Sequence, residues 1–347
     1  MTPDSPVRRA PAAAPSPAGR ARARWAAALV VALVSVIGIG GGTAHAETTG
    51  MVLDQQFVEN LGSGFDGPVS AITPLEDGGY LMGGAFSGYR GTPVGGIARL
   101  DADLQLDEQF NHDLGAGIVG QARQIVPMPD GGYLVVGTIF GFHGQWGTGH
   151  GILRLRPDLS LDTAFMDALG WYPFGPFATV RTALVEPDGA IVLGGEFTEF
   201  QGTPVGRLVR LTADLELDAA FAAATGTGFD GAVRAVLPAP EGGYLIAGSF
   251  GTYQGERAPR LALLDAGLQL STPVPDDLAA VLDDPDAAVS ALAPTGDGGY
   301  VAGGYWTEAD GTPGRGLMRL DARLHRDTAW ETWLGAGIQN SAIPPST

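Results

Sequence analysis

The sequence predicts an all-β fold built from five tandem copies of one unit. Each copy has an Asp-Gly or Glu-Gly turn between two short apolar runs, a third apolar run, and a closing segment that reads Leu-Asp in most copies. After residue 46 no stretch shows the long apolar period of 3.6 residues that an amphipathic helix needs. Tandem units of four short strands are typical of propeller blades. The predicted fold is therefore a single five-bladed β-propeller of four-stranded blades, preceded by a cleaved signal peptide.

The first two strands of each unit flank the turn. In the first unit the apolar runs cover residues 69–75 and 80–86, with Asp77-Gly78-Gly79 between them. Asp-Gly between such runs predicts a hairpin with a type I′ turn, in which both central residues have positive φ. The corresponding turns are Asp130-Gly131-Gly132, Asp188-Gly189-Ala190, Glu241-Gly242-Gly243 and Asp297-Gly298-Gly299.

The third strand of the first unit is expected at residues 97–100, and the fourth at residues 104–107, ending on Phe110. The closing positions 54, 107, 162, 218, 271 and 327 outnumber the hairpins by one. Either Leu53 to Phe57 or Asp327 to Trp330 could complete a blade begun at the other end of the chain. Because a closed ring leaves only short, protected strand edges, it is favoured over an open solenoid. The expected repeats cover about 53–105, 106–160, 161–216, 217–269 and 270–325, with a partial closing element at 326–347.

Residues 1–46 read as a secretory signal peptide. Five arginines precede an apolar stretch from Trp25 to about Ile39, and Ala44-His45-Ala46 places small residues at the two positions that a signal peptidase reads. The alternative is a retained membrane anchor, but the apolar stretch is shorter than the ~20 residues that a spanning helix needs. We expect cleavage after Ala46 and a secreted product, extracellular or associated with the cell wall, without stable membrane insertion.

The charge of the chain excludes some partners. It carries a net charge of −18 and contains no cysteine, and all its basic residues other than histidine are arginine. An acidic surface repels nucleic acid and anionic lipid, so neither is expected as a partner. Solubility alone explains such a charge, although attraction of cations or basic partners remains an alternative. The absence of cysteine excludes a disulfide framework.

One pair of positions within the repeat varies together. An arginine stands eight residues before an aspartate in four units, and the fourth unit replaces both residues, with Leu263 and Ser271. Loss of both partners in one copy predicts that the two residues touch on one face of a hairpin. We interpret them as structural ion pairs, which are Arg99 with Asp107, Arg154 with Asp162, Arg210 with Asp218, and Arg319 with Asp327.

Three segments match the G-x-G-x-x-G dinucleotide fingerprint, starting at Gly62, Gly115 and Gly226. The fingerprint needs a helix N-terminus after the glycines, because that helix end binds the pyrophosphate. Each match here runs directly into a predicted strand. The glycines therefore indicate tight loops between blades, and no bound cofactor is expected.

Positions that differ between copies are the candidates for function. Glu196 is the only acidic residue at its place in the second strand, and with Glu199, Glu308 and Asp310 it could form a carboxylate pair for glycoside chemistry. A solvated acid at a strand end is the simpler interpretation, so catalytic residues are expected to be none, with Glu196 as the alternative. The fifth unit carries an acidic insertion that could bind calcium, although a flexible charged loop is the favoured interpretation. Its acids are Asp276, Asp277, Asp283, Asp284 and Asp286.

Histidines and aromatic residues give weaker signals. Only His143 and His150 share a loop, which is too few ligands for a zinc site, so metal ligands stay unknown. An aromatic residue recurs at the same repeat position, two residues before a glycine, as Tyr89, Phe142, Phe200 and Tyr253. Such a row can stack on sugars, but recurrence in four units favours packing.

The third unit resembles the delta-60 repeat, a family of tandem propeller-forming repeats in exported bacterial proteins. The likeness rests on Leu161-Asp162 to Phe165, Glu186-Pro187-Asp188-Gly189, residues 191–198, Gly202-Thr203-Pro204 and Arg210-Leu211. It extends over about residues 53–330 and implies secretion, a repetitive β fold and a role in binding, with no established reaction. We therefore expect a secreted, non-catalytic module that binds a protein or glycan at the bacterial cell surface or beyond it. The alternative is a polysaccharide-active glycoside hydrolase or lyase that uses acids near Glu196.

Overall fold

The computed structural model describes residues 60–142, 145–146, 151–170, 172–175, 178–308, 311–312, 314 and 316–334. The chain divides into Met1–His45 and Ala46–Thr347, and every element described below lies in the second part. The predicted cleavage residues Ala44 and Ala46, and the first closing element, Leu53 to Phe57, lie outside the described residues. None of the described helices has the length and apolar character that spanning a bilayer requires.

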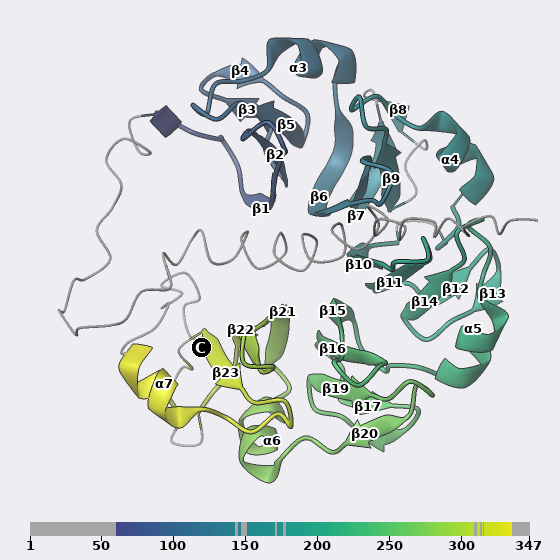
Figure 1. Ribbon diagram of the computed structural model, residues 1–347, viewed down its shortest axis with the longest axis vertical. Helices are drawn as coiled ribbons and strands as arrows, with labels where there is room; N and C mark the ends of the chain where they lie inside the picture. Colours follow the sequence, from purple (N-terminus) through teal and green to yellow (C-terminus); the bar gives the residue numbers. More distant parts are fainter. Residues whose placement is uncertain are drawn as a thin grey trace, which may run out of the picture. The chain divides into compact units, whose positions relative to one another are not determined.

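Five antiparallel sheets follow one another along the described residues (Figure 1). The first sheet consists of β1 (Val69–Pro74), β2 (Tyr80–Gly84) and β5 (Ile97–Leu100). The second consists of β6 (Ile118–Pro127), β7 (Tyr133–Phe142), β8 (Gln145–Trp146) and β9 (Ile152–Leu155). The third consists of β10 (Val180–Val185), β11 (Ile191–Gly195) and β14 (Leu208–Leu211). The last two are β15 (Val233–Pro238), β16 (Tyr244–Gly248), β19 (Leu261–Leu264) and β20 (Leu270–Thr272); and β21 (Ala288–Pro294), β22 (Tyr300–Tyr305) and β23 (Leu317–Leu320). The hairpins and third strands lie where the repeat predicted them.

The predicted fourth strand is wrong in four of the five units. After a single bridge, such as Leu100 to Leu106, the chain enters a seven-residue helix. The closing aspartate is the N-cap of this helix, and its carboxylate accepts the backbone N–H three residues on, which favours helix over strand. These helices are α3 (Glu108–Leu114), α4 (Thr163–Leu169), α5 (Ala219–Thr225) and α7 (Thr328–Leu334).

The fourth unit differs, and the difference follows from its sequence. Ser271 replaces the capping aspartate, and there the chain continues as the edge strand β20. Its helix α6 (Asp276–Leu282) starts later, in the acidic insertion. Leu278 and Leu282 of α6 are buried, so the expectation of a flexible charged loop is wrong for this segment.

Two-residue ribbons cover one end of three sheets. They are β3 (Gly88–Tyr89) with β4 (Thr92–Pro93), β12 (Glu199–Phe200) with β13 (Thr203–Pro204), and β17 (Thr252–Tyr253) with β18 (Glu256–Arg257). The recurring aromatics lie on these ribbons or at the end of β7, and all four are buried. The hydroxyl of Tyr89 donates to Leu104 O at 2.7 Å, and that of Tyr253 donates to Leu268 O at 2.8 Å. These residues pack inside the fold.

The four hairpin turns that contain aspartate are not of type I′. Only Gly78 has positive φ in the first turn, whereas type I′ requires it at both central residues. Instead, the Asp77 carboxylate accepts the Gly79 N–H at 3.0 Å, and this aspartate turn closes the loop. The fourth turn, which has glutamate in place of aspartate, has positive φ at both Gly242 and Gly243.

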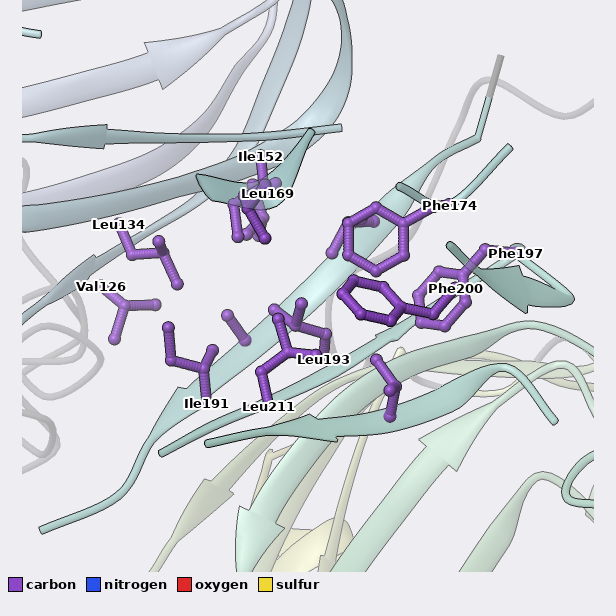
Figure 2. Close-up of a cluster of buried hydrophobic side chains, with 14 of the residues drawn as sticks. Val126, Leu134, Ile152, Leu169, Phe174, Ile191, Leu193, Phe197, Phe200 and Leu211 are labelled. Atoms are coloured by element: carbon purple, nitrogen blue, oxygen red, sulfur yellow. The ribbon is translucent and has the colours of Figure 1, made fainter. Parts of the chain in front are cut away.

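Consecutive sheets pack through their first strands. β1 contacts β6, β6 contacts β10, β10 contacts β15, and β15 contacts β21, so these five inner strands form a series. Figure 2 shows the apolar cluster between the second and third sheets, where Val126 and Leu134 face Ile191 and Leu193. Among the described residues the first and fifth sheets share no contact of comparable extent, so closure of the ring stays a prediction.

Candidate functional site

The structure brings each predicted arginine beside the predicted aspartate. Arg210 Nη1 donates to Asp218 at 2.7 Å, and Arg319 Nη1 donates to Asp327 at 3.0 Å. Arg99 pairs with Asp107, and Arg154 with Asp162, through the same atoms. These side chains are partly buried at the edge of each sheet.

Each of these arginines has a second aspartate partner, which was not predicted from the sequence. We call each arginine with its carboxylate partners a cluster. The turn aspartate accepts from the other terminal nitrogen of the same arginine, as Asp188 does from Arg210 Nη2 at 2.7 Å. Asp77, Asp130 and Asp297 accept in the same way from Arg99, Arg154 and Arg319. A signal was available, because the fourth unit also replaces its turn aspartate, with Glu241. Each cluster ties the hairpin turn and the third strand to the start of the helix.

Glu196 lies just after β11 and pairs with Arg181 of β10. Arg181 Nε donates to Glu196 Oε1 at 2.8 Å, and the Glu196 side chain is 46% exposed. Of the acids predicted near it, Glu308 pairs with Arg326 at 3.1 Å, and Asp310 lies outside the described residues. The ion pair of Glu196 is therefore with an arginine, and a carboxylate pair that includes Glu196 stays a prediction.

The acidic insertion does not gather its carboxylates. Asp276 and Asp277 lie in the first turn of α6, Asp283 pairs with Arg257, and Asp284 accepts the N–H of Asp286 at 2.9 Å. In the part of the chain that the structure describes, no three His, Asp or Glu side chains are grouped as metal ligands. His143 and His150 fall outside that part.

The glycines of the dinucleotide-like segments connect a helix end to a strand. Gly115 and Gly226 are the C-caps of α3 and α5, and β6 and β15 follow. The order is therefore helix, glycines, strand, the reverse of the fingerprint, in which a helix follows the glycines. Gly228 packs against Gly206 so closely that a Cβ on Gly228 would lie 2.3 Å from the Gly206 oxygen.

The inner strands carry a second constellation that was not predicted from the sequence. β6 has two register shifts, one of them between Val119 and Gly120, and the other four inner strands have one each. In all five strands a β-bulge places an extra residue seven positions before the acid of the hairpin turn. We call these residues the inner-strand row; they are Ser70, Arg123, Arg181, Arg234 and Ser290. Three consecutive sheets thus place an arginine at the bulge. Bulges re-aim side chains and are frequent beside functional sites.

Two hydrogen bonds connect residues of the inner-strand row to the neighbouring sheet. Arg234 Nη1 donates to Ser290 Oγ at 3.1 Å, and Gln121 Nε2, two residues before Arg123, donates to Ser70 Oγ at 2.9 Å. Burial lowers the pKa of Arg123, and the like charges of Arg181 and Arg234 add to this, while Glu196 opposes it. The three guanidinium groups therefore interact electrostatically, with Glu196 as an acid beside them.

A signal for the row was present in the sequence. The residue seven positions before the acid of the hairpin turn reads Ser, Arg, Arg, Arg, Ser through the five copies. Copy-to-copy differences in the second strand singled out Glu196, and the same comparison of the first strand would have found the arginines. The bulges that align them are visible only in the structure.

A separate cleft of about 590 Å³ lies between the first unit and the start of β6. Asp66, Ser87 and Gly95 line it on one side, and Ile118 and Gly120 on the other. The Asp66 carboxylate is occupied by the backbone N–H and the hydroxyl of Ser87. Asp66 and Ser87 thus hydrogen-bond to each other within the wall of the cleft.

Comparison with solved structures gives low similarity. Two crystal structures of the extracellular domain of BT4673 from B. thetaiotaomicron match at 14% identity, with TM-scores of 0.40 and 0.42 over 78% and 74% of this chain. This chain spans 28% of the length of those proteins. YCF48 bound to D1 peptide matches at 15% identity and a TM-score of 0.37, over 69% of this chain and 62% of that one. At these values the likenesses define neither a ligand nor an activity.

No curated protein matches the chain. Residues 75–110 and 186–221 match a family model described as a domain of unknown function, DUF5122, beta-propeller. These segments are the same part of the first and third units, from the hairpin turn to the capped helix. Two segments of the chain are therefore similar to a β-propeller repeat family.

Proposed function

We propose that the protein is a secreted, non-catalytic β-propeller of five delta-60-like blades that binds a protein or glycan at the bacterial cell surface or outside the cell. In this proposal the signal segment is cleaved after Ala46 and the five units close into one ring. The observation that carries the proposal is the inner-strand row, a set of polar side chains that take no part in the contacts common to the units.

Polar residues that recur in the units make contacts that stabilise the fold. The cluster arginines each hold two or more carboxylates, and the closing aspartates cap helices. The row differs in both respects, since its residues vary between copies and Arg123 has no ion-pair partner in the described part of the chain. Residues that vary between copies and keep free hydrogen-bonding capacity are suited to recognise a partner.

The state of Glu196 supports binding over hydrolysis. A glycosidase needs two carboxyl groups about 5 to 10 Å apart, one of them protonated. The Glu196 carboxylate instead accepts hydrogen bonds from Arg181. This arrangement suits a positioning residue in a binding site.

The proposal is tested on the full-length chain, expressed in an exporting bacterial host and purified from the medium. N-terminal sequencing of the product checks cleavage after Ala46. A glycan and peptide array measures binding, and a reducing-sugar assay on the bound glycans measures turnover. We expect binding without release of sugar. Release that is lost in Glu196→Gln and kept in Glu216→Gln, an exposed acid outside the row, would replace the proposal with the enzymatic alternative.

A further inference from the structure

We infer that the inner-strand row is a carboxylate-binding site for an acidic sugar, a uronic acid residue of a glycan. This rests on the proposed function and names the ligand class for the same site. Three guanidinium groups at equivalent bulges, exposed hydroxyl groups at both ends of the row and an exposed tyrosine ring are the features that fit such a ligand.

The arrangement of charge is the first step. The chain carries a net charge of −18, and the cluster arginines are each surrounded by carboxylates. The row differs from this pattern, because Arg181 pairs with Glu196 while Arg123 interacts electrostatically with both other arginines and with that same acid. Packing like charges together, partly away from water, is unfavourable unless a counter-charge is supplied. A bound carboxylate supplies it.

The hydrogen-bonding capacity of the row is the second step. Among the described residues, Nε of Arg123 and of Arg234 are buried without a partner, and no hydrogen bond engages the terminal nitrogens of Arg123. Those terminal nitrogens are not among the buried unpaired atoms of the described residues, so they reach solvent. A planar guanidinium group matches a carboxylate with two parallel hydrogen bonds. Arg123, which interacts electrostatically with both Arg181 and Arg234, is the expected anchor.

The surroundings of the arginines favour a sugar. Ser70 and Ser290 are exposed and offer hydroxyl groups at the ends of the row. Tyr305, which pairs with Ala288 beside the fifth bulge, is 45% exposed and presents an aromatic ring. An amphipathic ring packs against the apolar face of a sugar, while serine and arginine side chains bind its oxygens. A dense polyanion would be repelled by the acidic surface, which favours a ligand with isolated carboxylates.

Isothermal titration calorimetry on the purified full-length protein tests this. The probe is methyl β-D-glucuronide, and the matched neutral probe is methyl β-D-glucoside. We expect binding of the glucuronide alone, weakened about tenfold or more by Arg123→Gln, in line with loss of a charge-assisted hydrogen bond. Arg257→Gln removes an exposed arginine far from the row in sequence and should leave the affinity unchanged.

The stability of the variants separates a binding role from a structural one. Arg123→Gln relieves repulsion, so its thermal midpoint should stay the same or rise, whereas Arg210→Gln breaks a cluster and should lower the midpoint. A fall for Arg123→Gln as large as that for Arg210→Gln would overturn the inference and make the row structural. Tyr305→Ala supplies a second variant with the charge intact, and it should weaken glucuronide binding.

Other outcomes distinguish the inference from the proposed function. Array binding to neutral glycans or to peptides that Arg123→Gln leaves unchanged would overturn the inference and leave the proposed function standing. Inorganic sulfate or an acidic peptide that binds as tightly as the glucuronide would overturn the assignment to an acidic sugar. Absence of binding to every array member and to the glucuronide would overturn both.

Discussion

Asp218 accepts a hydrogen bond from Arg210 at 2.7 Å with one carboxylate oxygen, while the other oxygen accepts the Phe221 N–H at 3.0 Å and caps helix α5. One carboxylate thus joins the third strand of the sheet to the helix after it. The same double contact recurs at Asp107, Asp162 and Asp327. The ion pair and the N-cap therefore depend on the same aspartate. In the fourth unit, which has Ser271 in its place, the chain continues as a strand.

Substitutions at Asp218 should separate the two contacts. Asp218→Asn keeps an oxygen for capping and loses the charge, so we expect a loss of about 1 to 2 kcal/mol in the free energy of unfolding, between the values for exposed and buried pairs. Asp218→Ala should lose about 1 kcal/mol more, the usual value of an N-cap. Urea denaturation measures both.

A double-mutant cycle of Arg210→Leu with Asp218→Asn should give a coupling of about 1 kcal/mol, within the range for residues in contact. A coupling indistinguishable from zero would show that the pair contributes nothing. Ser271→Ala is the matched control in the fourth unit, where no cluster exists, and it should change stability by less than about 0.5 kcal/mol.

Stability should fall in acid because two carboxylates of the Arg210 cluster, Asp218 and Asp188, have lowered pKa values in the folded protein. The Phe221 N–H and then Arg210 lower the pKa of Asp218, against the opposing effect of burial, and the Ala190 N–H and Arg210 lower that of Asp188. A pKa lowered on folding contributes stability above the unfolded value of about 3.9, and that contribution is lost as the pH falls through the folded value. Unfolding midpoints from pH 7 to pH 2.5 should therefore decline below about pH 4. Asp218→Asn should decline less steeply, and an equal decline would argue against a role for this carboxylate.

The sequence predicted the strands well because their signals are local. The third strand was expected at residues 97–100 and is β5, Ile97–Leu100, and the hairpins follow the Asp-Gly turns. The helices were missed because seven residues are too few for an apolar period. Helix α3 buries only Phe110 and Leu114, one i,i+4 pair. The readable signal was the cap, an aspartate three residues before a buried phenylalanine, which was interpreted as the end of a strand.

The candidate site was partly predictable for a different reason. Glu196 stood out as the only acid at its place, but its partner Arg181 lies fifteen residues earlier on a neighbouring strand. The pairing of these strands brings the two together, and the bulge at Arg181 sets the direction of its side chain. Which residue of a strand becomes the bulge depends on backbone register, and the sequence carries no separate mark of it.

Two equivalent tyrosines should respond differently to removal of the hydroxyl group. The Tyr244 hydroxyl donates to Glu186 of the preceding unit at 2.6 Å, whereas the buried Tyr300 hydroxyl has no partner among the described residues. The preceding unit of Tyr300 has Ala239 at the place of Glu186. Tyr244→Phe should cost about 1.5 to 3 kcal/mol, as for a hydrogen bond to a charged group, and Tyr300→Phe should be neutral or stabilising. Urea denaturation of the two variants side by side measures the difference, and equal losses would contradict the pairing.

The glycines between units should be needed for packing. Gly228 has φ 63° and lies against the next loop, so that an added Cβ would be 2.3 Å from the oxygen of Gly206. Gly255 has a similar φ of 83°, but nothing lies within 4 Å of the position of its Cβ. Gly255→Ala should therefore cost only the backbone strain, about 1 to 2 kcal/mol. Gly228→Ala adds a clash with backbone that cannot move aside, and it should cost at least about 3 kcal/mol. Thermal and urea unfolding of the secreted variants measure the two costs; if they are equal, the glycine serves only its own loop, and the close approach of Gly228 to Gly206 does not hold the neighbouring units together.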